Sequence, residues 1–326
     1  MSQPLVSIIT PTYNREDLLE ETIQSVLAQG YPNLEYIVID DGSSDNTRQI
    51  LERYQDRLSW YHHPNMGETR TVNRGFQLAR GEVICVLSSD DPMLAGSIQA
   101  AVDALTAHPE ALVAYPDWVR IDETGTIFDE VRTSDYSFRD MVLWHDCVPG
   151  PSTFFRRSLL EKVQGRDPAF RYTGDFDFWL RAALHGPFLR IPHLYGCFRE
   201  HRGSTSVAAL SPDMATEHIA LMDSFFALGP PPEIAALRRD AYSSAYFTAG
   251  FVVGPDFRER LRYFTRALRM SSWSFFWRQR NRLPTMLILL FEACPAVATF
   301  RRILLDRQRT SPWRGRHYSL VAGDTT

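Results

Sequence analysis

Short apolar runs alternate with helical patterns along the first part of the chain. The runs that predict strands cover 5–10, 34–40, 58–63 and 82–88, and the first of them is a short β-branched run. The segments that place apolar residues on one helical face cover 15–30, 44–57 and 69–81. Asn14 is the expected N-cap of the first helix, and Gly30 is its expected C-terminal stop. Strands separated by helices of this length predict βαβ units, and therefore an α/β fold with a mostly parallel sheet covered by helices.

The alternation loosens after residue 95. The pattern there predicts a helix over 97–109, a strand over 111–121, a tight turn over 122–126 and a helix over 174–186. From 206 onwards the pattern is helical, and no strand is predicted. The sequence thus predicts an α/β domain over 1–205, with halves 1–95 and 96–205, and a helical C-terminal region over 206–326.

Polar residues follow each of the first four predicted strands, in the segments TPTYNR, DDGSSDNT, HPNMGETR and SSDDP. Ligands of parallel sheets bind outside the carboxyl ends of the strands, so we expect these segments to meet at one edge. The adjacent carboxylates of Asp90 and Asp91 suit a divalent cation that is shared with substrate phosphates. The alternative is that Asp91 caps a helix that begins after Pro92.

The polar segments after the first two strands indicate a nucleotide. Asp40 and Asp41 can accept hydrogen bonds from a nucleobase or a ribose, or else cap the next helix, as we expect of Asp45. Tyr13 offers a face for stacking, and Arg15 offers a cation for phosphate. The glycine-rich fingerprints of dinucleotide and P-loop sites do not follow the first strand. A nucleotide sugar whose diphosphate is screened by a metal ion fits these residues better.

Composition changes this interpretation only in the C-terminal region. Hydrophobic residues make up 44% of the chain and charged residues 23%, and the formal net charge of −4 gives no general attraction for nucleic acid. Residues 255–316, however, carry fourteen arginines against four acidic residues. Aromatic residues mix with the arginines over 257–282, which is typical of peripheral membrane contact or, alternatively, of a helical appendage on the catalytic domain. Nucleic acid is not an expected partner, because no binding motif for it accompanies the charge.

The remaining sequence features bear on the cellular compartment of the protein. The four cysteines form no CxxC pair, and the N-terminus lacks the basic region and cleavage site of a secretory signal. The apolar run 283–300 contains Glu292 and Pro295 and is too short for a membrane span. We therefore expect a cytoplasmic protein, which would lie on the cytoplasmic face of the inner membrane if its tail binds lipid.

Four blocks in order resemble the family 2 glycosyltransferases: VSIITPTYNR, YIVIDDGSSDNT, NMGETRTVNRGFQLARGEVICVLSSDD and GDFDFWLRAALHG. This resemblance covers residues 5–205 and implies a GT-A fold. It also implies inverting transfer of a sugar from a nucleoside diphosphate sugar, with a UDP-sugar as the expected donor. The acceptor would be a hydroxyl of a glycan or lipid-linked glycan in cell-surface polysaccharide or glycolipid synthesis, and the cofactor would be Mn²⁺ or Mg²⁺.

The resemblance also assigns residues. Asp175 looks like the general base, although Gly174 stands where many members have glutamate. Asp90 and Asp91 match the DxD-type metal motif with Ser89 in place of its first acid, so most of the metal role falls to Asp91, and His201 could complete the metal shell. Asp41 looks like the aspartate that hydrogen-bonds the nucleobase. The residues expected to bind the donor are Thr10, Thr12, Tyr13, Arg15, Asp41, Asn65, Gly67, Arg70 and Asp90.

An inverting transfer needs a base on the side of the sugar opposite the departing diphosphate, which Asp175 on its separate segment would supply. Asp177 is the second candidate base, and the alternative for Asp175 is that it only caps its helix. Residues 148–163 are expected to form the acceptor floor. Trp118, Trp144 and Trp179 are candidates for stacking on a sugar, against the alternative of core packing.

Two other functions stay open at this point. A sugar-phosphate nucleotidyltransferase also combines an α/β fold with a nucleotide and Mg²⁺, but it would want a glycine-rich basic loop after the first strand, which TPTYNRED is not. A catalytically inactive family member that acts as a binding partner is the second, and the presence of Asp41, Asp91 and Asp175 argues against it.

Overall fold

The structure is a computed structural model, and it describes residues 3–201, 203, 210–278, 282–283 and 286–287. The chain divides into two compact units. The first contains the described residues up to Tyr136 together with Val148–His201. The second contains Ser137–Cys147 and the described residues from 203 to 287. The domain boundary predicted at 205 stays a prediction.

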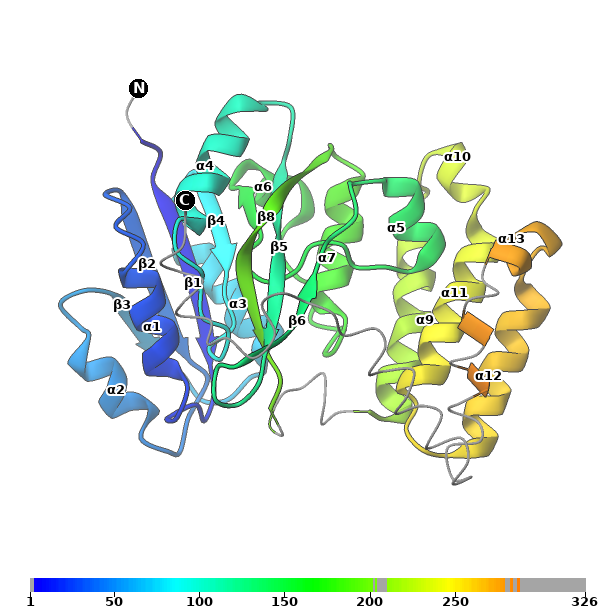
Figure 1. Cartoon of the computed structure of the whole chain (residues 1–326), viewed down its shortest axis with the longest axis horizontal. Coiled ribbons are helices and arrows are strands. Elements are labelled where there is room, and N and C mark those ends of the chain that lie inside the picture. Colours follow the sequence, from blue (N-terminus) through cyan, green and yellow to red (C-terminus); the bar gives the residue numbers. More distant parts are fainter. Residues whose placement is uncertain (1–2, 202, 204–209, 279–281, 284–285, 288–326) are drawn as a thin grey trace. The chain divides into compact units, whose positions relative to one another are not determined.

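The first unit is built on a mixed sheet, whose order within the described residues is β3-β2-β1-β4-β7-β5-β6, with β8 paired to β5 (Figure 1). The strands are β1 (Val6–Thr12), β2 (Leu34–Asp40), β3 (Ser59–His62), β4 (Val83–Val86), β5 (Val113–Ile121), β6 (Ile127–Val131), β7 (Phe154–Arg156) and β8 (Phe188–Arg199). The four predicted strands of the first half are confirmed, and they pair in parallel. Strand β7 is antiparallel to β4 and to β5, so β5 and β8 run in the same direction as β1. The ends of β1–β4 and of β8 therefore lie at one edge.

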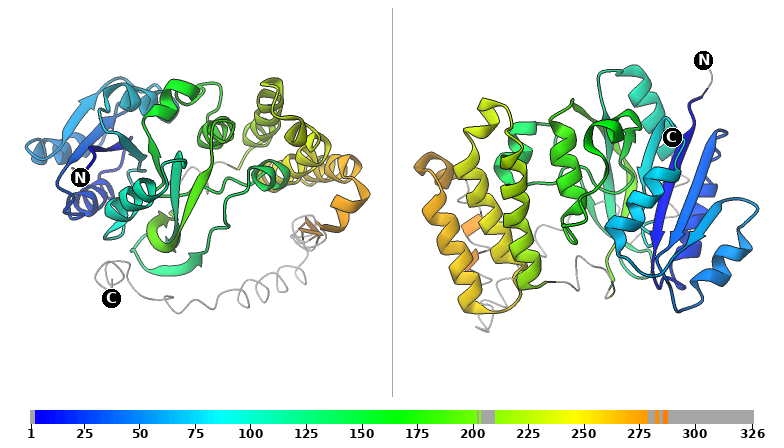
Figure 2. Two further views of the ribbon diagram at one scale, coloured as in Figure 1. Left: turned by 90° about the horizontal axis from the view of Figure 1, so that it is seen from above. Right: turned by 180° about the vertical axis from the view of Figure 1, so that it is seen from behind.

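Helices cover both faces of this sheet, as the view from above in Figure 2 shows. The helices of the first unit are α1 (Leu19–Leu27), α2 (Thr47–Arg53), α3 (Glu68–Leu78), α4 (Ser97–Ala107), α6 (Ser158–Val163) and α7 (Gly174–Ala183). Val6 and Ile8 of β1 share one core with apolar residues of α1, α2 and α4. Ile9 points to the other face, where Gly75 of α3 lies against it. This alternation is the two-residue period of a strand, and it explains why β1 is buried throughout.

Strands β7 and β8 were not predicted from the sequence. Strand β7 has only three residues, and it is fixed by pairing on both sides rather than by a pattern of its own. Strand β8 contains Pro192 and Gly196, both of which are depleted in strands. Its long parallel pairing with β5 tolerates them because the register shifts between Pro116 and Trp118.

The expected N-cap role of Asn14 is wrong. Helix α1 begins at Leu19 after Leu18, and Asn14 has a positive φ of 51°. Its side-chain Oδ1 instead accepts a hydrogen bond from the backbone of Ser44, 2.8 Å away, in the loop after β2. The N-cap position of α2 is Asn46 and not Asp45, although Oδ1 of Asp45 accepts from Thr47 N at 3.0 Å just before the helix.

The second unit is helical in its described residues. Its helices are α5 (Phe138–Trp144), α9 (Pro212–Ala227), α10 (Pro232–Ala235), α11 (Arg238–Val252), α12 (Phe257–Met270) and α13 (Trp273–Arg278). Helix α11 contacts α5, α9 and α12, and is the centre of the unit. No described helix is both long and apolar enough to cross a membrane. The predicted apolar run 283–300 lies almost entirely outside the described residues.

The turn after β2 requires a glycine. Gly42 has a φ of +82°, and a Cβ atom there would lie 2.6 Å from Asn65 N. Gly30 also has a positive φ, of +64°, but a Cβ atom there would meet nothing within 4 Å. The two glycines therefore separate the cost of the backbone conformation from the cost of a close contact.

We expect Gly42→Ala to lower the free energy of unfolding by about 2–4 kcal/mol, because a left-handed backbone and a clash add. The matched control Gly30→Ala should cost about 1–2 kcal/mol, because only the conformational part applies. Urea unfolding monitored by circular dichroism measures both. Equal losses in the two variants would contradict the close approach of Gly42 to Asn65.

Candidate active site

The carboxylate of Asp41 organises the loop that leads into α3. Asp41 is buried just beyond the end of β2, and its Oδ1 and Oδ2 accept from Met66 N at 2.7 Å and from Gly67 N at 2.9 Å. Gly67 has a φ of +88°, which lets the chain turn around the carboxylate. The structure thus brings Asn65 and Gly67, predicted from a different segment, to Asp41. An ionised carboxylate has about four acceptor sites, so capacity remains for a ligand.

The neighbouring Asp40 has a structural role. It is fully buried, and it accepts from Ser43 N at 2.9 Å, from His62 Nδ1 at 2.8 Å and from Arg48 Nε at 3.3 Å. Burial alone would raise the pKa of Asp40, but the hydrogen bonds from Ser43, His62 and Arg48 hold it below its usual value. Asp40 therefore stabilises the strand end, while Asp41 holds the loop.

The four donor-site residues predicted from the first strand and the segment after it divide into buried and more accessible ones. Thr10 is buried with its hydroxyl 3.2 Å from that of Tyr36. The Thr12 hydroxyl is also buried, and among the described residues it has no hydrogen-bond partner. Tyr13 is 47% exposed, as a stacking platform has to be. The Nε atom of Arg15 lies 3.4 Å from Oδ2 of Asp90, which joins the ends of β1 and β4.

Asp90 and Asp91 have different surroundings. Oδ2 of Asp90 lies 2.9 Å from Nε2 of His201, as well as near Arg15. Asp91 is buried, and its Oδ1 accepts from the backbone N–H of Arg199 at 2.8 Å. Burial, and then the charge of Asp90, raise the pKa of Asp91 well above its usual value. Helix α4 begins only at Ser97, after Gly96, so the alternative that Asp91 caps a helix after Pro92 is wrong.

Arg199, which the sequence analysis missed, holds the aspartate pair in place. Its side chain is 1% exposed, and Nη2 lies 2.6 Å from Oε2 of Glu21 in α1. Its Nε donates to the carbonyl of Asp90 at 3.0 Å, and its Nη1 donates to the carbonyls of Asp122 and Glu123, each at 3.1 Å. In the sequence it is one arginine among many, and only its place at the end of β8 marks it.

The chemistry of this edge suits a divalent cation bound together with phosphate. A carboxylate from Asp90 and an imidazole from His201 are ligands that Mn²⁺ accepts, and Mg²⁺ binds through one or two carboxylates plus substrate phosphates. The described residues contain no cluster of three or more His, Cys, Asp or Glu side chains that could hold a metal alone. Substrate phosphates and water molecules commonly supply the remaining ligands of such a cation.

Asp175 and Asp177 also have different surroundings. Helix α7 has Thr173 as its N-cap, so Asp175 lies in its first turn, exposed, and the alternative of an N-cap role is wrong. Asp177 is buried, and its Oδ2 lies 2.5 Å from Nη2 of Arg181. The same guanidinium donates to the carbonyls of Val163 and Gly165. Asp177 is thus part of a structural ion pair, and Asp175 is the better placed of the two to meet a ligand.

Helix α7 is tied to α3, which starts at the Asp41 loop. Thr69 of α3 donates its hydroxyl to the carbonyl of Phe170 at 2.9 Å. Asn73 exchanges two hydrogen bonds with the backbone of Arg166, of 2.7 and 2.8 Å. These contacts hold the segment before α7 against α3. They therefore fix the position of Asp175 relative to the loop that Asp41 holds.

The three predicted tryptophans differ in role. Trp179 is buried among Phe155, Phe178 and Phe188, and is a core residue. Trp144 belongs to the second unit, where it packs on Phe275.

Trp118 lies half-buried against the backbone of Gly150, at which a Cβ atom would come within 2.8 Å of its indole nitrogen. In the adjoining predicted acceptor segment, Ser152 has a positive φ of 57°. Its buried hydroxyl has no hydrogen-bond partner among the described residues.

We expect Arg199→Met to lower the free energy of unfolding by roughly 3 kcal/mol or more, because it leaves three backbone carbonyls without their donor and Asp91 without a nearby positive charge, although the backbone N–H of residue 199 still donates to Asp91. The matched control is Arg53→Met, which breaks an exposed pair of 2.9 Å with Glu20, the residue next to Glu21. That control should cost less than about 1 kcal/mol. Urea unfolding of both variants tests the difference, and a small loss for Arg199→Met would show that the guanidinium is not a structural hub.

Comparison with known proteins gives the chain its family. Residues 7–163 match the family model described as Glycosyl transferase family 2. An uncharacterized glycosyltransferase of Mycobacterium tuberculosis is 33% identical over 187 residues, which are 56% of this chain and 70% of that protein. One from Rickettsia typhi is 30% identical over 199 residues, which are 59% of this chain and 61% of that protein. The chain thus spans about three-fifths of the length of this Rickettsia relative.

Solved structures agree on the fold. S. aureus TarS, residues 1–349 in complex with UDP-GlcNAc, has a TM-score of 0.65 and 21% identity, covering 91% of this chain and 89% of that one. The mannosyltransferase PcManGT of Pyrobaculum calidifontis, in complex with GDP-Man and Mn²⁺, has a TM-score of 0.58 and 17% identity, covering 92% of this chain and 83% of that one. Together with the sequence relatives, these findings place the chain in glycosyl transferase family 2, with a GT-A fold.

Proposed function

We propose that the protein transfers a sugar from a nucleoside diphosphate sugar to a hydroxyl group of a glycan or lipid-linked glycan, with inversion at the anomeric carbon. The observation that carries this proposal is the meeting of Asp90, Arg15 and His201 at the sheet edge that also holds Asp41 and its loop. At that edge the Asp90 carboxylate and the His201 imidazole would bind a metal ion, and the Arg15 guanidinium would bind the diphosphate. The loop that Asp41 holds would bind the nucleoside.

The donor would lie along the ends of β1, β2 and β4. Tyr13 would stack on the nucleobase, and Asp41 would accept from it while still holding Gly67. The unsatisfied hydroxyl of Thr12 would hydrogen-bond the ribose, which would remove the cost of leaving it unpaired. Asn65 and Arg70 would approach the donor from the loop and from α3, and Thr10 would support the strand end from below. That UDP is the nucleotide is supported by TarS, which binds UDP-GlcNAc, whereas PcManGT binds GDP-Man.

The cation would be held by Asp90 and His201 more directly than by Asp91. Asp90 is the member of the pair that adjoins Arg15 and His201, whereas Asp91 is committed to the backbone of Arg199. Asp91 would act indirectly, because its hydrogen bond from the Arg199 backbone holds the turn that presents Asp90. A bound Mn²⁺ or Mg²⁺ would offset the charge that develops on the leaving diphosphate. Mn²⁺ accompanies GDP-Man in PcManGT, which supports this choice of cofactor.

Asp175 would be the general base. It would take the proton of the acceptor hydroxyl as that oxygen attacks the anomeric carbon, and the bond from that carbon to the diphosphate oxygen would break with its electrons leaving on the phosphate. Arg15 would attract the departing charge. Ser152 and Trp118 would contact the sugar acceptor, because Ser152 has an unsatisfied buried hydroxyl and Trp118 is half-buried beside Gly150 in the same segment. A role in cell-surface polysaccharide or glycolipid synthesis follows from the family resemblance.

Nucleotide sugars should protect the full chain against thermal unfolding, with a larger shift in Tm when Mn²⁺ is present, because a ligand of the native state stabilises it by mass action. Asp90→Asn should abolish the Mn²⁺-dependent part of that shift and keep a smaller nucleotide-dependent part. Asp56→Asn, an exposed aspartate outside the proposed site, is the control and should behave like the parent chain. A Tm that no nucleotide sugar changes would contradict the proposed donor.

Asp175→Asn should reduce the rate of transfer to the acceptor by roughly a hundredfold or more, because the acceptor hydroxyl loses its base. Its thermal shift with donor and Mn²⁺ should equal that of the parent chain, which separates the base from the donor-binding residues. Initial rates across pH with the best donor of the panel measure this effect. Near-normal turnover in the variant would rule out Asp175 as the base, and donor binding without any turnover in the parent chain would indicate an inactive member.

A further inference from the structure

Helix α12 packs on the second unit through one face. Phe264 is buried, with its ring centroid 6.1 Å from that of Phe247 and 5.4 Å from that of Phe251, both in α11. Gly250 of α11 makes this possible, since a Cβ atom there would lie 2.4 Å from the ring of Phe264. The orientation of α12 about its axis is therefore fixed by close packing.

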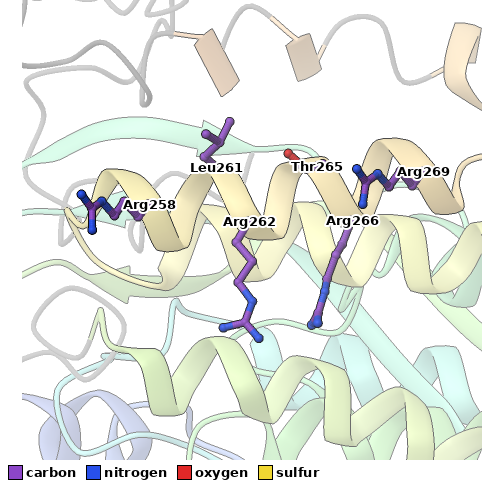
Figure 3. Close-up of a pocket in the computed structure, with 6 residues that line it drawn as sticks. All are labelled: Arg258, Leu261, Arg262, Thr265, Arg266 and Arg269. Carbon is purple, nitrogen blue, oxygen red and sulfur yellow. The ribbon is translucent and has the colours of Figure 1, made fainter.

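The side of α12 that is turned away from Phe264 carries a row of arginines, one of which, Arg266, also lies over the ring of Tyr246 in α11, 5.8 Å from its centroid. We call this side the arginine face; it consists of Arg258, Leu261, Arg262, Thr265, Arg266 and Arg269 (Figure 3). On an ideal helix these positions fall within an arc of roughly 140°. All four arginines are exposed, and so is Leu261, at 43%. Among the described residues, the acid paired with this row is Glu259, whose carboxylate is 3.7 Å from Arg262.

Helix α13 adds exposed tryptophans next to this face in the chain. Trp273 is 76% exposed and Trp277 is 49% exposed, and their ring centroids lie 5.7 Å apart. The helix is held by its other side, where Phe275 is buried against Trp144. Asp240 of α11 fixes the corner between α12 and α13 by accepting from the backbone and the hydroxyl of Ser272, at 2.7 and 2.8 Å. The tryptophans are thus presented to solvent by an ordered corner.

We propose that the arginine face and the two tryptophans of α13 dock the protein on the surface of an anionic lipid bilayer. Guanidinium groups complement the negative headgroups of such a bilayer, and indole rings partition into its interfacial layer. An acidic protein or a nucleic acid duplex would complement the arginines alone and would leave the exposed tryptophans without an apolar environment, and stacking of single-stranded bases on the indoles is the alternative that RNA binding tests. The combination of a cationic row with exposed aromatic rings therefore favours lipid.

The experiment is sedimentation of the full chain with vesicles of phosphatidylcholine containing phosphatidylglycerol, compared with pure phosphatidylcholine. We expect partition into the anionic vesicles only, and a decrease of that partition with added salt. The double variant Arg262→Gln/Arg266→Gln should reduce the partition coefficient by about thirtyfold, from a contribution of about 1 kcal/mol for each arginine near an anionic surface. Trp273→Ala/Trp277→Ala should also weaken binding and leave a salt-sensitive remainder.

The matched control is Arg53→Gln/Arg57→Gln, which removes the same charge from two exposed arginines at the end of α2 and just beyond it. It should bind anionic vesicles as the parent chain does. Melting curves of all variants establish that each is folded. The proposal is overturned if the control loses as much binding as the arginine-face variant, if both vesicle types bind equally, or if the chain binds RNA or polyglutamate through these arginines and ignores vesicles.

Discussion

The buried guanidinium of Arg199 is the interaction on which the site depends. Two neighbouring carboxylates at a strand end repel each other, and one of them, Asp91, is removed from water. Arg199 supplies a backbone donor to that carboxylate, a positive charge nearby, and a donor to the carbonyl of Asp90. Thr22 of α1 adds a hydrogen bond to the carbonyl of Ser89, so the whole turn is held from two sides. Asp90 can then point outward because its neighbour and its backbone are fixed.

Sequence patterns predicted the strands, and the polar segments at their ends, whose own residues carry a recognisable pattern. Strands β1 and β2 were found because both of their faces are covered by helices, which leaves a continuous apolar signal. The polar segments at their ends followed from the geometry of a parallel sheet. Strand β8 left no comparable signal, because Pro192 and Gly196 are tolerated only in the shifted pairing with β5. Arg199 was missed with it, since its importance comes from contacts with α1 and with the turn after β5 that no local pattern encodes.

The paired acids show a second limit of sequence reasoning. Three pairs, Asp40 with Asp41, Asp90 with Asp91 and Asp175 with Asp177, each contain one side chain committed to the fold and one that is available or partly available to a ligand. The residue type is the same in every case, and the difference lies in which donors the fold brings to each carboxylate. Asp40 and Asp41 are adjacent residues at the end of a strand, where successive side chains point to opposite sides. Asp175 and Asp177 are two residues apart on helix α7, which places them about 200° apart around its axis. The assignment of roles within each pair required the structure.

The position of helix α5 in the chain affects how the protein folds during its synthesis. It follows β6 in the chain, yet Phe138 packs edge-to-face on Phe225, and the carbonyl of Leu143 accepts from the hydroxyl of Ser244. During synthesis α5 therefore emerges from the ribosome well before the helices that cover its apolar side. A chain that ended near residue 205 would leave Met141, Val142 and Leu143 without that cover, and we expect such a fragment to aggregate. A single truncation therefore does not separate the two units, because α5 of the second unit lies in the chain between two segments of the first.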